Sequence, residues 1–93
     1  MIIGVASIKI YAPWVHSLKE KCMVVKSIIS KVQNKFNISI SEIDAQDIHQ
    51  TIVLGIACVT NTTKFADSMI DGVITFIEDH TEAEILDIYR EIR

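Results

Sequence analysis

The sequence predicts a single α+β domain in which strands and helices follow one another in the order β-α-β-β-α-β. Four segments are rich in β-branched residues or alternate between apolar and polar residues, as strands do. Two other segments repeat apolar residues at spacings of three and four, as helices with one buried side do. The three glycines and the one proline are scattered, so no linker divides the 93 residues. We therefore expect residues 1–93 to form one domain.

The first strand and the first helix have clear expected boundaries. Residues 2–11 are rich in β-branched residues, and Pro13 then ends the strand. The helix begins with a capping box, in which Ser17 bonds a free amide and Glu20 reaches back to the cap. Asn37 is a suitable stop for this helix. The apolar spacing predicts a buried stripe that consists of Leu18, Cys22, Val25, Ile29, Val32 and Phe36.

The middle of the chain predicts a hairpin. Residues 38–45 alternate between apolar and polar side chains, which is typical of a strand with one side in solvent. A short polar turn over residues 46–49 leads to residues 51–59, which are apolar on both sides, as in a central strand. The two strands are therefore expected to be neighbours in one sheet.

A second helix and a final strand complete the chain. Asn61 or Thr62 can cap the helix, which is expected to run to about Asp79. Its predicted buried side carries Phe65, Met69, Ile70, Val73, Phe76 and Ile77. The final strand is expected from about Ala83 to Ile92.

This order of elements predicts the ferredoxin-like, or split βαβ, arrangement. Two right-handed crossovers with a hairpin between them give a four-stranded antiparallel sheet with both helices on one face and the first and third strands in the centre. Even-numbered strand residues are the larger and more apolar set and are predicted to meet the helices, namely Ile2, Ile8, Ile10, Ile52, Leu54, Ile56, Cys58, Leu86 and Ile88. The opposite face is predicted to carry Ile3, Val5, Lys9, Tyr11, Val53, Gly55, Ala57, Val59, Ile85 and Tyr89.

Composition excludes several classes of protein. Apolar residues make up 49% of the chain and charged residues 23%, which excludes a disordered tail. Two cysteines cannot form an all-thiolate zinc site or a multi-bridge secreted scaffold. The longest apolar runs are far shorter than the ~20 residues that span a bilayer, and no basic segment of a signal peptide follows Met1. We therefore expect a reduced cytoplasmic protein that has no membrane partner and needs no cofactor.

Charge is distributed unevenly along the chain. Residues 1–37 hold six lysines and one acid, whereas residues 38–93 hold eleven acids and three basic residues. This asymmetry predicts a basic face; the alternative is that the two halves of one fold attract each other. The sheet face without helices is neither polar nor bulky, and apolar patches of this kind indicate interfaces. We expect a homodimer that forms through this face or through an edge strand of the same sheet.

The start of the first helix is the first candidate binding site. Its free amides and positive dipole end, together with His16, Lys19 and Lys21, could bind a phosphate. In the alternative interpretation, Ser17 and its capping partner already satisfy the amides and the lysines are merely solvated. Trp14, in the preceding loop, either covers the edge of the core or anchors a partner.

Lysines along the first helix are the second candidate. Together with Lys19, Lys26 could follow a nucleic-acid backbone, since lysine contacts to phosphate give affinity that does not depend on sequence. The third strand offers no aromatic residue for base stacking, so we expect contact with a structured RNA or a ribosomal component through the helix instead.

Catalytic and metal sites are not predicted. Asp44, Asp47 and His49, with Glu42 close by, form the only cluster of acids and histidine, and turn chemistry is the commoner reason for such a cluster. The two cysteines are expected to be buried as small apolar side chains with no base to activate them.

The chain resembles the YlxP-like family of small bacterial proteins, a domain of unknown function, over essentially its whole length. The resemblance rests on residues 1–5 (MIIGV), 16–21 (HSLKEK), 44–47 (DAQD) with Gln50, and 54–57 (LGIA). It departs from the family where an arginine usually follows HSLKEK, here Cys22, and where an aromatic is common, here His49. The resemblance implies a ferredoxin-like fold and a gene neighbourhood shared with translation and ribosome-maturation factors.

The residues and the resemblance together predict a non-enzymatic interaction module linked to translation or ribosome maturation. The alternative is a small regulatory domain that binds an anionic ligand at the start of the first helix.

Overall fold

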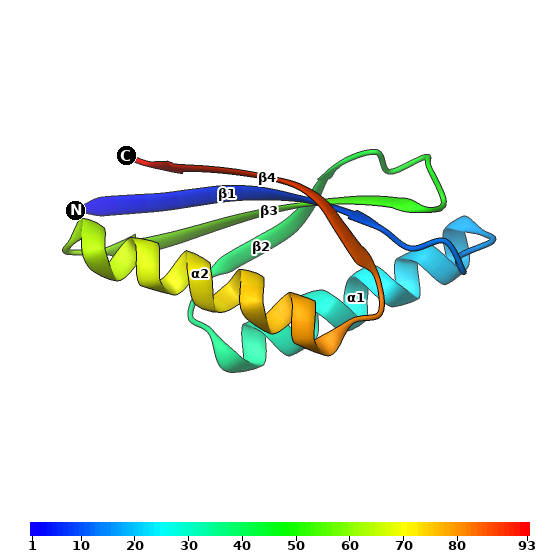
Figure 1. Ribbon diagram of the computed structural model, residues 1–93, viewed down its shortest axis with the longest axis horizontal. Helices are drawn as coiled ribbons and strands as arrows, with labels where there is room; N and C mark the ends of the chain where they lie inside the picture. The colour runs from blue at the N-terminus through cyan, green and yellow to red at the C-terminus, as the bar shows by residue number, and fades with distance from the viewer.

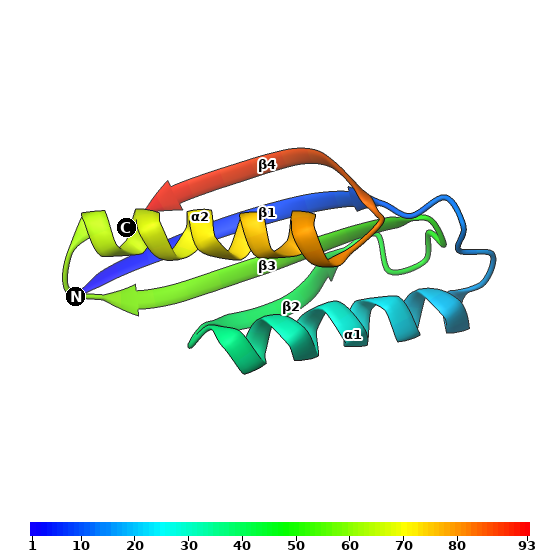
Figure 2. The same ribbon diagram turned by 60° about the horizontal axis from the view of Figure 1, so that its bottom comes forward.

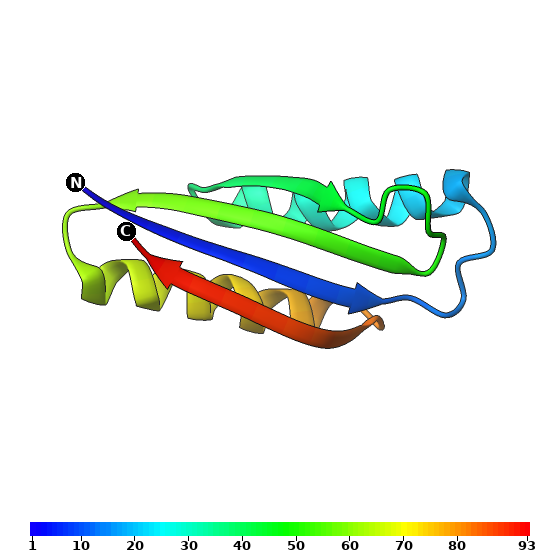
Figure 3. The ribbon, with the colours of Figure 1, turned by 90° about the horizontal axis from the view of Figure 1, so that it is seen from above.

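The computed structural model describes residues 1–93 and confirms the predicted order of elements. They are β1 (Ile2–Tyr11), α1 (Leu18–Lys35), β2 (Ser39–Asp44), β3 (Thr51–Thr60), α2 (Thr63–His80) and β4 (Glu84–Ile92). The four strands pair antiparallel in the order β2-β3-β1-β4. Both helices cover one face of the sheet, and the other face carries no helix (Figures 1 and 3). The fold is therefore ferredoxin-like.

Both helices begin at the caps that the sequence predicts. The Ser17 hydroxyl accepts a hydrogen bond from the Glu20 amide at 3.1 Å, and the Thr62 hydroxyl accepts one from the Phe65 amide at 3.1 Å. Each bond satisfies one of the amides that a helix leaves free in its first turn. Helix α1 lies beneath β2, and α2 lies beneath the central strands (Figure 2). Neither helix is long and apolar enough to cross a membrane.

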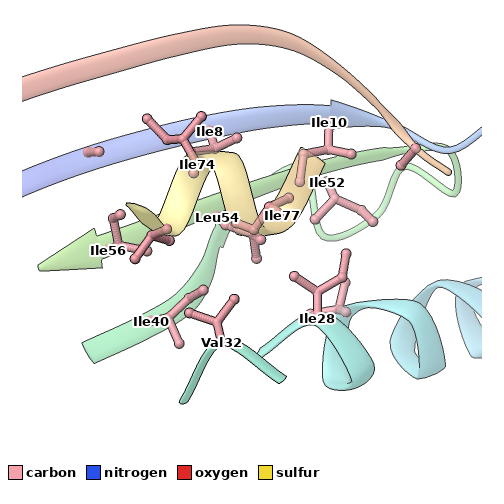
Figure 4. Close-up of a cluster of buried hydrophobic side chains, with 14 of the residues drawn as sticks. Ile8, Ile10, Ile28, Val32, Ile40, Ile52, Leu54, Ile56, Ile74 and Ile77 are labelled. Carbon is pink, nitrogen blue, oxygen red and sulfur yellow. The ribbon is translucent and has the colours of Figure 1, made fainter. Parts of the chain in front are cut away.

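The core lies between the sheet and the two helices. Ile8 and Ile10 of β1 and Ile52 and Leu54 of β3 are fully buried. Figure 4 shows these side chains gathered with isoleucines and a valine from both helices and from β2. On β1 and β3 the even-numbered residues therefore face the helices, as predicted. Cys58 follows the same rule and is buried.

The prediction for β4 is wrong for both Ile85 and Leu86, because the strand contains a β-bulge. Asp87 pairs with Lys9, but Ile85 pairs with Ile10, which leaves Leu86 as an extra residue. A bulge of this kind shifts the alternation of side chains by one. Ile85 consequently packs against the core, whereas Leu86 is 48% exposed. Ile88 lies opposite Ile8, and it is 37% exposed because β4 is an edge strand.

Both helices are rotated about their axes relative to the predicted stripes. Leu18 and Cys22 were expected in the core, yet both are exposed. On α2, Phe65 is exposed, and Ala66 and Ile74 are buried instead. The core-facing residues of α1 are Lys21, Val25, Ile28 and Val32. The predicted stripe is confirmed at Val25 and Val32, which are buried, and Ile29 and Phe36 pack against the core. It is wrong at Leu18 and Cys22, because it excluded lysine, which here occupies a core-facing position.

Candidate functional site

Helix α1 presents four exposed lysines, Lys19, Lys26, Lys31 and Lys35, which we call the α1 lysines. The only acidic residue on the helix is Glu20. None of the four ammonium groups lies within 4.0 Å of a carboxylate, because the ion pairs of the chain involve other cations. The side of α1 that faces away from the sheet carries no other element (Figure 2). The α1 lysines are therefore open to an anionic partner.

The α1 lysines lie on two sides of the helix, because each residue turns the helix by about 100°. Lys31 and Lys35 face α2, where the Lys35 ammonium lies 5.0 Å from the centre of the Phe76 ring. Lys19 and Lys26 project on the side away from α2. These two cations are the ones that a large partner can approach without touching α2.

Lys21 was expected at the surface, either in contact with a phosphate or merely solvated, but its side chain is buried. It is only 2% exposed, and its ammonium donates hydrogen bonds to the carbonyls of Ala45 and Ile48, the second at 2.7 Å. The ammonium also lies 2.9 Å from Oε2 of Glu42, a buried oxygen with no hydrogen-bond donor otherwise. The expectation of a solvent-facing Lys21 is wrong, because α1 turns this residue toward the sheet.

Lys21 instead holds the loop between β2 and β3. Ala45 adopts a positive φ of 58°, and its carbonyl accepts both the Lys21 ammonium and the Ile48 amide, the latter at 3.0 Å. This one side chain thus ties the turn of the hairpin to the first turns of α1. The position of Glu42 in the sequence indicates that a cation lies nearby. Glu42 is on the same, core-facing side of the strand as Ile40, and a buried acid requires a cation.

The loop between β1 and α1 places Trp14 at an open hollow between the helices. Ala12 and Val15 are fully buried, so they close the end of the core, and Trp14 is left 40% exposed. Trp14 lines a hollow of about 350 Å³ together with Met23, Val24, Ser27, Ile28, Lys31, His80, Thr81 and Glu82. The ring of Trp14 therefore offers an exposed apolar surface next to an α1 lysine.

His16 is exposed and lines a different hollow, of about 400 Å³, which it shares with His49 and Tyr11. The two loops that carry these histidines are held together: the Gln50 side-chain amide donates to the Pro13 carbonyl at 3.0 Å. The proximity of His16 and His49 was not predicted. The signal for it was topological, because antiparallel pairing of Tyr11 with Thr51 brings both loops to the same end of the sheet.

The acids of the hairpin turn are engaged locally. The Asp44 carboxylate accepts the Ala45 amide at 2.8 Å, and Glu42 is paired with Lys21. No group of three or more His, Cys, Asp or Glu side chains lies close enough together to hold a metal ion.

The acidic half of the chain contains its own ion pairs, between arginines and carboxylates. Arg90 of β4 binds the carboxylates of Asp71 and Asp67 on α2, and these contacts, Asp71 foremost, raise the pKa of the guanidinium. At the end of β4, hydrogen bonds from Tyr89 and then from Arg93 lower the pKa of the Glu91 carboxyl. Here basic and acidic side chains satisfy each other, in contrast to the α1 lysines.

Comparison with known proteins gives one family. The family described as "Protein of unknown function (DUF503)" matches residues 3–90. The "Uncharacterized protein YlxP" of Bacillus subtilis (strain 168) is 46% identical over 68 residues, which cover 73% of this chain and 74% of that protein. A de novo designed protein with a ferredoxin fold, solved by NMR, superposes with a TM-score of 0.63 at 23% identity. That match covers 100% of this chain and 86% of the designed one, and it supports the fold alone.

Proposed function

The chain belongs to the DUF503 family of proteins of unknown function, and we propose that it is a non-enzymatic module that binds structured RNA through the α1 lysines. The observation that carries this proposal is a helix with four exposed lysines and no paired carboxylate. Lysine contacts to phosphate supply most of the affinity of proteins that bind nucleic acids without reading sequence. A role in translation or ribosome maturation is part of the proposal, because structured RNA is the main component of ribosomal particles.

The net charge of −3 does not oppose this function, because the acids lie on other elements. Helix α2 carries Asp67, Asp71, Glu78 and Asp79, and β4 carries further acids. An RNA that approaches the outer side of α1 meets Lys19 and Lys26 first. The distribution of charge therefore favours binding in one orientation.

The alternative function, capture of a small anion at the start of α1, has less support. Lys21 turns away from that end of the helix and is occupied by two carbonyls and Glu42. The Ser17 hydroxyl already accepts one of the free amides. Lys19 and His16 are left as the cations that could hold such a ligand, and RNA is therefore the partner we propose.

The test is co-sedimentation of the protein with purified ribosomal particles at about 50 mM and about 200 mM salt. If the four α1 lysines contact phosphate, log K should fall with log salt with a slope of about −3, which is roughly a 60-fold loss of affinity over this range. The double variant Lys19→Gln, Lys26→Gln should reduce the magnitude of the slope by about 2 and weaken binding at least tenfold at the lower salt concentration.

The matched control is the double variant Lys64→Gln, Arg93→Gln, which removes the same amount of positive charge from α2 and from the C-terminal end. It should bind like the wild type, because neither residue lies on α1. Equal affinity of the two double variants, or an affinity that does not change with salt concentration, would contradict the proposal. Binding to extracted ribosomal RNA as well as to the particles would identify RNA, rather than a ribosomal protein, as the partner.

A further inference from the structure

The outer face of the sheet, which carries no helix, has a small-residue centre. Ser7 of β1 and Gly55 of β3 pair in one row of the sheet, between Ser41 of β2 and Tyr89 of β4. This face holds a shallow apolar hollow of about 370 Å³, whose lining includes Ser7, Ser41, Ile43, Gly55, Ala57 and Tyr89. Figure 3 shows the four strands from this side with nothing covering them.

Strand β2 contributes one further apolar side chain to this face, beside a β-bulge. Glu42 pairs with Leu54 and Asp44 with Val53, so Ile43 is an extra residue in β2. Its side chain lies over Gly55, where a Cβ would come within 2.8 Å of the Ile43 Cγ2. Ile43 is 53% exposed and Tyr89 57% exposed, and they stand on either side of the hollow.

We propose that the outer face packs against the outer face of a second copy of this chain, with the two-fold axis parallel to the strands. Strands of up to ten residues rise about 3.4 Å per residue and lie about 4.8 Å apart, so four strands offer a face of roughly 600 Å². Two such faces bury about 1,200 Å², the lower limit for specific interfaces. The area suffices for a dimer that forms at micromolar concentrations.

The charges at the two margins of the face determine the orientation. Asp87 and Glu91 project from β4, on the side of Lys9 and Val5, whereas β2 presents Ser39 and Ser41. A two-fold axis across the strands would place β4 over β4 and bring these acids together. An axis along the strands places β4 over β2 of the partner copy, so that Tyr89 meets Ser41 and Ser7 meets Gly55. Like-charge contact is therefore smallest in the arrangement that we propose.

This inference is independent of the proposed binding of RNA. The two layers of helices would lie on the outside of the dimer, so the α1 lysines would remain exposed on both copies. A monomeric protein could still bind RNA, and a dimeric protein could fail to bind it.

Sedimentation velocity at about 100 µM tests the association, since interfaces of this size give micromolar dissociation constants at the weak end of their range. The wild type should sediment as a dimer of the 10.5 kDa chain. Ala57→Lys, which puts a charge into the hollow, should weaken association at least tenfold, with an unchanged circular dichroism spectrum. Ser30→Lys, on the exposed side of α1, is the matched control and should remain dimeric.

Two results would overturn the proposal: a monomeric wild type, or an Ala57→Lys variant that dimerises as well as the control. If Ala57→Lys does not fold, Ser7→Lys places the same charge in the same hollow from β1. Cross-linking tests the orientation in a Cys22→Ser background, with a short bis-maleimide because facing sheets lie about 10 Å apart. A mixture of Ser41→Cys and Tyr89→Cys proteins should cross-link, whereas self-cross-linking of Tyr89→Cys would overturn the proposed axis.

Discussion

Replacing Lys21 with methionine should lower the free energy of unfolding by about 3 kcal/mol, although the residue lies in a segment of charged surface-type residues. Methionine keeps most of the length and volume of the side chain but removes the ammonium. The carbonyl of Ile48 then loses its donor, and Oε2 of Glu42 is left buried without a cation. Because the Glu42 side chain is 21% exposed and can regain some water, the effect is smaller than for a fully buried ion pair.

Lys19→Met is the matched control, since it makes the same change two residues away on the exposed side of α1. It should change stability by less than about 0.5 kcal/mol in urea denaturation. The double variant Lys21→Met, Glu42→Leu should recover at least about 1 kcal/mol relative to Lys21→Met, because it removes the unpaired charge. Equal effects of Lys21→Met and Lys19→Met would contradict the buried position of Lys21.

The same variant has a local readout. Lys21 joins α1 to the turn at Ala45 and Ile48, so its loss should increase hydrogen exchange in the loop between β2 and β3 before the rest of the sheet is affected. The Gln50 side-chain amide, at the end of this loop, donates to the Pro13 carbonyl and so joins the hairpin to the loop before α1.

The order of the elements could be predicted because each pattern repeats over many residues. Strands β1 and β3 each have ten residues, so one residue that departs from the alternation does not hide the strand. Both helix caps are short motifs in which a hydroxyl accepts a hydrogen bond from a free amide. The facing of individual side chains could not be predicted as well. One lysine in a core-facing position was enough to rotate the expected stripe of α1 toward Leu18 and Cys22.

The candidate site was predicted in part for the same reason. The exposure of Lys19 and Lys26 could be predicted from the sequence, because most lysines in proteins are exposed. The burial of Lys21 could not, because the acceptors that make burial tolerable are two backbone carbonyls and a carboxylate from a distant segment. Nor does the sequence around Leu86 or Ile43 mark a bulge, since neither has a neighbouring glycine or proline.

Leu54→Ala should lower the free energy of unfolding by about 3–4 kcal/mol, because it truncates a fully buried side chain of the core. Leu54 is fully buried at the centre of β3, among side chains from the helices and from β2 (Figure 4). Truncation removes its burial and leaves a cavity that surrounding isoleucines with stiff β-branched side chains fill poorly. Since a domain of this size has a stability of only about 5–14 kcal/mol, the loss should be plain in urea denaturation.

Leu86→Ala is the matched control, and it decides whether the bulge in β4 exists in solution. With the bulge, Leu86 is 48% exposed, and its truncation should cost less than about 1 kcal/mol. Without the bulge, strict alternation would place Leu86 beneath α2, and the loss should approach that of Leu54→Ala. The complementary variant Ile85→Ala should show the reverse. Its loss of stability should be large with the bulge and small without it, because Ile85 packs against the core only if the extra residue is present. A larger loss for Leu86→Ala than for Ile85→Ala would therefore contradict the bulge and the pairing of Ile85 with Ile10.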